Sequence, residues 1–104
     1  MTAVIWIHQA RPRTSWYSAS EEEKSALLQR WSASDAEALA AGSDRIGTYS
    51  VRGQSDYSTV ELWRFASPEL AFDFWERRVR EDYAVWFAFS NQLGVAIESG
   101  EDDG

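Results

Sequence analysis

The stretch GTYSVRGQSDYSTVELWRF, residues 47–65, decides the fold because it predicts two adjacent antiparallel strands. Side chains alternate in character on both sides of RGQSD, residues 52–56, and such alternation is typical of β-strands. The central segment combines a glycine with polar side chains, a composition that favours a hairpin loop. We therefore expect one strand over residues 44–52 and a second over residues 57–65.

The hairpin is followed by SPELAFDFW, residues 67–75, which has the pattern of a helix N-terminus. Ser67 is a suitable N-cap residue, and Pro68 falls in the first turn, where its missing N–H costs nothing. Apolar residues then recur on one helical face. We expect this helix to break near Asp82 and a short aromatic helical turn to follow it before Asn91.

The N-terminal part of the chain predicts a strand and then a helix. Residues 3–10 alternate between two faces, and Pro12 ends the strand because proline cannot donate to a β-ladder. Ser20 and Glu23 form a capping box, in which the serine accepts from the third helical N–H and the glutamate reaches back. Gly42 is a suitable C-terminal stop for this helix.

A last strand is expected over residues 93–98, which makes the element order β-α-β-β-α-β. This is the ferredoxin-like arrangement of an α+β protein, with an antiparallel four-stranded sheet and two helices on one face. Because aromatic side chains occur on both faces of the strands, the uncovered face is expected to meet a partner, and we predict a homodimer. Residues 1–99 are expected to form one domain, and residues 100–104 an acidic, disordered and dispensable tail.

Composition narrows the classes of function. The 104 residues carry a net charge of −7, which argues against nucleic-acid binding, and contain no cysteine, which excludes disulfides and thiolate metal sites. With one histidine and no phosphate-binding loop, dinucleotide fingerprint or nucleophile elbow, we expect no metal and no cofactor. No apolar run approaches the roughly 20 residues of a membrane span, so we expect a cytoplasmic protein without membrane contact. Nine arginines against one lysine indicate a bacterial source.

The element order and the two stretches quoted above resemble the dimeric α+β barrel superfamily, over about residues 3–98. Members include small cofactor-independent monooxygenases of polyketide pathways, muconolactone-type isomerases, haem-degrading monooxygenases and proteins of unknown role. The resemblance implies that two sheets pair into a barrel and that each subunit keeps a pocket between its own sheet and helices. In the haem-degrading members the axial ligand lies on a helix, and neither predicted helix here contains a histidine.

His8, the one histidine, is the leading catalytic candidate. Histidine alone among side chains titrates near neutral pH without perturbation, so in a pocket it can take or give a proton as a general base. The alternative interpretation is structural, with the imidazole packed beside Trp6 and bonded to a backbone carbonyl. The strand pattern places both residues on the same face and leaves the two interpretations open.

The candidate substrate-binding residues are aromatic or acidic side chains, and they comprise Trp6, Trp63, Trp75, Tyr83, Tyr49 and Glu61. Aromatic faces bind flat ligands by stacking, and indole N–H or phenol O–H groups can fix the orientation of such ligands. The alternative is that these aromatic residues form only the core and a dimer interface. Glu61 either faces solvent, pairs with an arginine such as Arg52, or lies in the pocket as a base with a raised pKa.

The leading hypothesis is a small cofactor-independent biosynthetic enzyme of secondary metabolism. It would oxygenate, cyclise or isomerise an aromatic or polyketide-like substrate, with His8 as the base. The alternative is a non-catalytic dimer of the same fold that binds a small hydrophobic or aromatic ligand, and a third possibility is a purely structural dimer with a filled core. The fold alone does not choose among them.

Overall fold

The computed structural model describes residues 3–53 and 55–97. Within them the chain forms four strands and four helices, and the element order contains the predicted β-α-β-β-α-β pattern. The elements are β1 (Val4–Pro12), α1 (Thr14–Ser18), α2 (Glu21–Ala40), β2 (Asp44–Ser50), β3 (Thr59–Phe65), α3 (Pro68–Arg80), α4 (Tyr83–Trp86) and β4 (Phe87–Gly94).

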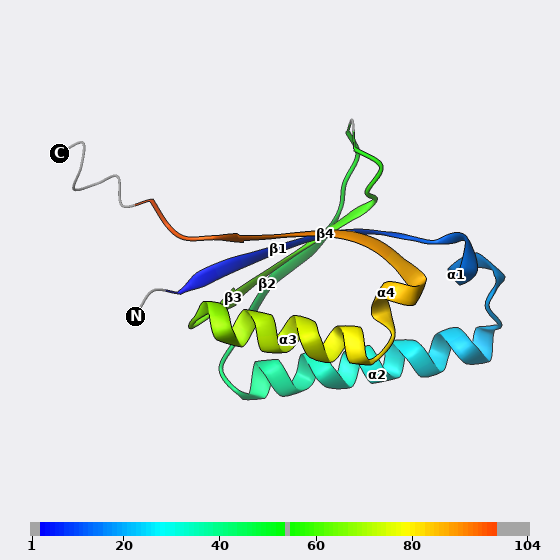
Figure 1. Cartoon of the computed structure of the whole chain (residues 1–104), viewed down its shortest axis with the longest axis horizontal. Helices are drawn as coiled ribbons and strands as arrows, with labels where there is room; N and C mark the ends of the chain where they lie inside the picture. The colour runs from blue at the N-terminus through cyan, green and yellow to red at the C-terminus, as the bar shows by residue number, and fades with distance from the viewer. Residues whose placement is uncertain (1–2, 54, 98–104) are drawn as a thin grey trace.

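The four strands form one antiparallel sheet in the order β2-β3-β1-β4, so the first strand of the chain lies between the third and the last. The register places Trp6 of β1 opposite Trp63 of β3 and Leu93 of β4. Helices α2 and α3 lie side by side on one face of this sheet, and no described helix covers the other face (Figure 1). This confirms the predicted ferredoxin-like α+β architecture.

Local signals for the two long helices are also confirmed. The Ser20 hydroxyl accepts from the Glu23 backbone N–H at 3.0 Å, and the Ser67 hydroxyl accepts from the Leu70 N–H at 3.3 Å. Helix α2 ends at Ala40, two residues before Gly42, whose φ of +102° suits a residue without a side chain. These signals act within one helical turn, so they can be identified without tertiary context.

Two predicted boundaries in the C-terminal half are wrong. The last strand runs over Phe87–Gly94 rather than residues 93–98, and the aromatic helical turn is confined to Tyr83–Trp86. The strand starts early because aromatic residues fit a half-buried sheet as well as a helix, and pairing with β1 decides between them. The predicted break is confirmed at Asp82, whose φ of 71° is left-handed and redirects the chain after α3.

Smaller corrections concern the strand ends and a short helix. The hairpin strands are shorter than predicted, over Asp44–Ser50 and Thr59–Phe65, and the loop between them is correspondingly longer. The predicted end of the first strand at Pro12 is confirmed, and Pro12 pairs with β4 but not with β3. The segment after it contains the one-turn helix α1 over Thr14–Ser18, for which the sequence pattern predicted no element.

The sheet has two faces of different character. On β1, residues Val4, Trp6, His8 and Ala10 point toward the helices and are buried, whereas the side chains between them are only half-buried on the outer face. The helix-side residues contribute to two adjoining hydrophobic clusters, the first around Trp6 and the second around Ala10. The inner face therefore holds the core, and the outer face is left without a covering layer in the described chain.

Two further observations concern sequence predictions. Of the described helices, none is long and apolar enough to cross a membrane. The predicted acidic tail, residues 100–104, and the predicted domain end at residue 99 lie outside the described residues.

Candidate functional site

The site is centred on His8, in the middle of β1 on the helix side of the sheet. Its side chain is 1% exposed and stacks on Trp6, with ring centroids 4.8 Å apart. Nδ1 lies 2.6 Å from the side-chain oxygen of Asn91 on β4, and Nε2 lies 2.8 Å from the Tyr83 hydroxyl on α4. Both ring nitrogens are thus bonded to side chains, rather than to the backbone carbonyl that a purely structural histidine was expected to use.

His8 is neutral at physiological pH. Burial lowers its pKa from 6.5 to about 4, because a charged imidazolium loses its hydration in the core. The Arg78 cation lowers the pKa further, while the hydrogen bond to Asn91 and the charge of Glu61 oppose the change. The imidazole can therefore donate one hydrogen bond and accept another, as its two partners require.

A buried charge cluster lies next to this histidine. Arg78 of α3 is 4% exposed, and its guanidinium donates to Glu61 of β3 at 2.9 and 3.2 Å and to Asp35 of α2 at 2.9 Å. Trp63 adds an indole N–H bond to Glu61 at 2.9 Å. Burial acts to raise the pKa of Glu61, but the bonds from Arg78 and Trp63 outweigh it and hold this pKa below its ordinary value.

Glu61 is therefore a paired carboxylate. Its partner is Arg78 and not Arg52, which the sequence offered as an example. The same guanidinium lies 5.4 Å from the ring centre of Trp6 and 5.1 Å from that of Tyr83, distances at which a cation is attracted to an aromatic ring. Arg78 thus connects helices α2 and α3 to strand β3 and contacts the aromatic rings beside it.

An apolar cavity of about 320 Å³ opens between α3 and β4, beside the histidine. Asn91 connects the two, because its side chain both lines the cavity and contacts His8. The complete lining consists of Trp6, Ala71, Phe72, Trp75, Asn91, Gln92 and Leu93.

The structure brings six of the seven predicted site residues together on the inner face. Trp6 and Trp75 line the cavity, and the other four, which lie behind it, are His8, Trp63, Tyr83 and Glu61. Tyr49 is separate: it pairs with Val60 on the outer face of the sheet and is 49% exposed. Its side chain lies across Gly47, where an added Cβ would be 2.5 Å from the Tyr49 hydroxyl.

Sequence reasoning missed Asn91, Arg78 and Asp35. Arg78 had a usable signal, because it falls on the apolar stripe of α3, where a charge must find a buried partner. Asn91 had none, since it is 83 residues from His8 and was expected only to follow a helical turn.

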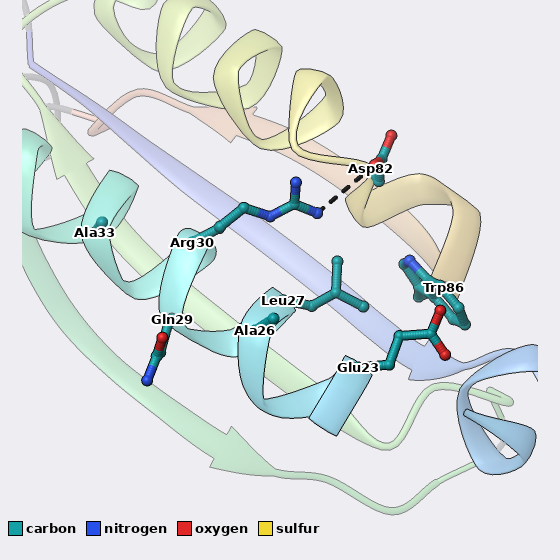
Figure 2. Close-up of a pocket in the computed structure, with 8 residues that line it drawn as sticks. All are labelled: Glu23, Ala26, Leu27, Gln29, Arg30, Ala33, Asp82 and Trp86. Atoms are coloured by element: carbon teal, nitrogen blue, oxygen red, sulfur yellow. Dashed lines mark ion pairs between the residues drawn. The ribbon is translucent and has the colours of Figure 1, made fainter. Parts of the chain in front are cut away.

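A larger groove of about 620 Å³ lies on α2 next to α4 and is shown in Figure 2. Its charged lining is partly self-paired, with Arg30 3.6 Å from Asp82. Among the described residues that line this groove, none is one of the seven predicted site residues. In the described chain no group of three or more His, Cys, Asp or Glu side chains is placed to hold a metal ion.

No protein-family model matches the chain, and no curated protein matches its sequence. Solved structures do match. A mutant chlorite dismutase from Candidatus Nitrospira defluvii, in complex with cyanide, superposes with a TM-score of 0.75 at 11% identity, over 92% of this chain and 40% of that one. The chain thus spans about two fifths of the length of that enzyme.

Two other similar structures are of this chain's own size. A dabb family protein with a ferredoxin-like fold from Mesorhizobium loti has a TM-score of 0.59 at 14% identity, over 93% of this chain and 99% of that one. SnoaB, a cofactor-independent oxygenase from Streptomyces nogalater, has a TM-score of 0.53 at 12% identity, over 94% and 96%. At such identities the likeness concerns the fold. Together with the sheet order, it establishes that the chain has a ferredoxin-like α+β fold.

Proposed function

We propose that the protein binds a flat, mostly apolar small molecule in the cavity between α3 and β4. The observation that carries this proposal is the lining, in which two indole rings and a phenyl ring, those of Trp6, Trp75 and Phe72, surround a space of about 320 Å³. Small-molecule sites occupy roughly 300–1,000 Å³ and are lined mainly by apolar groups with a few polar ones. Phe72 is 57% exposed, so its ring is available to contact a bound ligand.

The proposed ligand is a fused aromatic ring system, because such molecules match both the size and the stacking surfaces of the cavity. Acenaphthene is a suitable probe, since it is flat and has no polar group. Binding is measured by NMR chemical-shift titration of the isotope-labelled protein, and the shifted amides should be those around the cavity. Shifts confined to the α2 groove would contradict the proposal.

Leu93→Trp is the blocking variant for this experiment. Leu93 lines the cavity and is 38% exposed, so an indole can extend over the cavity without entering the core. Leu39→Trp is the matched control, because Leu39 is similarly exposed, at 42%, and does not line the cavity. Loss of acenaphthene binding in the first variant alone supports the proposed site, and equal binding in both variants overturns it.

Cofactor-independent turnover is the second candidate function, and the observation that favours it is the neutral imidazole next to the cavity. The low pKa keeps His8 unprotonated at pH 7, which is the state that a general base requires, and the cavity residue Asn91 separates it from the ligand. A substrate group that replaces the Asn91 oxygen would contact Nδ1 directly. Nδ1 could accept its proton only if substrate binding shifted the imidazole to the tautomer that carries its proton on Nε2 and donates it to the Tyr83 oxygen. The reaction would be oxygenation, cyclisation or isomerisation of an aromatic or polyketide-like substrate, and SnoaB, of similar fold, is named a cofactor-independent oxygenase.

The proposed assembly is a homodimer that pairs the outer faces of two sheets. Ile5, Ile7, Val60 and Leu62 lie on this face in adjoining strands and are only half-buried. Apolar patches of this kind are usually covered in a soluble protein, and a second copy offers a self-complementary apolar surface. The cavity opens on the other side of the sheet, so a dimer of this type leaves it accessible.

A further inference from the structure

A chain of four side chains links the buried charge cluster to the cavity. The guanidinium carbon of Arg78 lies 5.1 Å from the ring centre of Tyr83. The Tyr83 hydroxyl lies 2.8 Å from Nε2 of His8, and Nδ1 of His8 lies 2.6 Å from Oδ1 of Asn91. Asn91 then lines the cavity. The direction of the hydrogen bonds along this chain decides which polar atom faces a bound ligand.

The Asn91 oxygen sets the direction of these hydrogen bonds. An amide oxygen only accepts, so Nδ1 of His8, which lies 2.6 Å from it, carries the imidazole proton and donates. The other nitrogen of a neutral imidazole is then an acceptor, so Nε2 accepts from the Tyr83 hydroxyl at 2.8 Å.

The same contact fixes the orientation of the Asn91 carboxamide. The carboxamide meets Nδ1 of His8 with its oxygen, at 2.6 Å, and its NH₂ group is therefore turned away from His8. Among the described residues this nitrogen has no hydrogen-bond partner. It is not among the fully buried side-chain atoms without a partner, so it is not fully enclosed by the protein.

Apart from two indole N–H groups, the rest of the lining offers no polar side-chain group on the inner face. Gln92 also borders the cavity, but it pairs with Ile7 and belongs to the outer face of the sheet by strand alternation. The remaining lining residues have aromatic or aliphatic side chains, with only the indole N–H groups of the two tryptophans as further donors.

We infer that Asn91 is the specificity-determining residue of the cavity and that it selects ligands with an acceptor oxygen, such as an aryl ketone or a phenolate, because His8 holds its NH₂ group toward the ligand. His8 is in this respect a positioning residue. The inference rests on the proposed function, because it names the class of ligand for the same cavity.

The test compares 1-acenaphthenone with acenaphthene, which differ by one carbonyl group, in NMR titrations of the wild-type protein. A neutral hydrogen bond predicts that the ketone binds about two- to tenfold more tightly. Asn91→Asp keeps the size of the side chain and an acceptor for His8, but it replaces the NH₂ group by an oxygen, so the preference should disappear or reverse. Gln29→Asp is the control of equal charge, because Gln29 is exposed on α2 and does not line the cavity, and it should retain the preference.

His8→Phe tests the positioning role, because it keeps a ring next to Trp6 and removes the donor that holds Asn91. In this variant the ratio of the Kd of acenaphthene to the Kd of 1-acenaphthenone should fall toward one, while acenaphthene still binds. A preference that is unchanged in both Asn91→Asp and His8→Phe overturns the inference while leaving the proposed cavity in place. If neither compound binds the wild-type protein, the proposed function fails and the inference fails with it.

The tautomer provides a readout that needs no ligand. Because His8 is the one histidine of the chain, the ¹⁵N NMR spectrum contains a single pair of imidazole nitrogens. The inference requires the proton on Nδ1 at pH 7 in the folded protein. A proton on Nε2 would turn the Asn91 NH₂ group toward His8 and its oxygen toward the cavity, and it would overturn the inference directly.

Discussion

Nε2 of His8 lies 2.8 Å from the hydroxyl oxygen of Tyr83, although 75 positions separate the two residues in the sequence. The contact joins the central strand β1 to the short helix α4, and it holds an uncharged imidazole in the core. We expect the stability of the protein, its response to acid and its proposed chemistry to depend on this histidine and the groups bonded to it.

Acid is expected to destabilise the protein through His8. Its pKa is about 4 in the folded protein and 6.5 in the unfolded chain, so between these values only the unfolded chain is protonated. The contribution of His8 to the free energy of unfolding has its full value above pH 6.5. As the pH drops toward 4, the free energy of unfolding decreases by up to about 3 kcal/mol. Urea unfolding of wild type and His8→Gln from pH 7.5 to 4.5 measures this effect. Asp35 and Glu61 titrate in both proteins, so equal slopes in the two series would contradict the prediction.

Removing the buried cation should be far more damaging than removing an exposed one. Arg78→Met leaves the Glu61 carboxylate without its cation and leaves Asp35 with Arg45 alone, and we expect a loss of about 3–5 kcal/mol in the free energy of unfolding. Arg80→Met is the control, because the Arg80 side chain is 66% exposed and makes only a 3.9 Å contact with Glu76. Its effect should stay within about 0.5 kcal/mol. Similar urea midpoints for the two variants would show that the cluster contributes little.

If the protein turns over a substrate, His8→Gln should reduce the rate about a hundred- to ten-thousand-fold per folded molecule. A suitable reaction is the oxidation of anthrone, in which one O₂ converts one anthrone to anthraquinone and one water. Anthraquinone formation and O₂ uptake are measured together with the melting temperature, because loss of the His8 bonds is also expected to cost about 1–3 kcal/mol of stability. An unchanged rate in a variant that melts earlier would leave His8 without a catalytic role and favour the binding function.

The outer face of the sheet should mediate dimerisation. Light scattering at micromolar concentration is expected to give twice the chain mass of 11.8 kDa. Leu62→Arg places a charge in the centre of this face and should give a monomer, whereas Leu28→Arg, at an exposed position of α2, should remain dimeric. A wild-type monomer would contradict the proposed assembly.

The parts of the fold that sequence reasoning predicted are those set by neighbouring residues. Ser20 and Ser67 cap helices through atoms three residues away, and the alternation around Trp6 correctly places Trp6 and His8 on one face of β1. The start of β4 at Phe87 was missed because its aromatic residues suit either structure until β1 pairs with them.

Sequence reasoning predicted only a part of the candidate site, and the reason is similar. His8 and its aromatic neighbours stand out by residue type, whereas Asn91 is an ordinary polar residue until the sheet register places it beside His8. Tyr49 had the same residue type as Tyr83, but strand alternation on β2 turns it to the outer face. Residue type therefore identified candidates, and the register of long-range pairing separated those in the site from the rest.

The position of β1 between β3 and β4 has a consequence for how the chain matures on the ribosome. Of the four strands β1 is synthesised first, yet its second neighbour is synthesised last, so one of its edges stays unpaired until β4 has emerged. A nascent chain that stops before residue 87 has Tyr83 but lacks Asn91, and so it cannot complete the bonds of His8. Chaperones that recognise exposed strands would therefore compete with β4 for β1 until translation reaches the end of this strand.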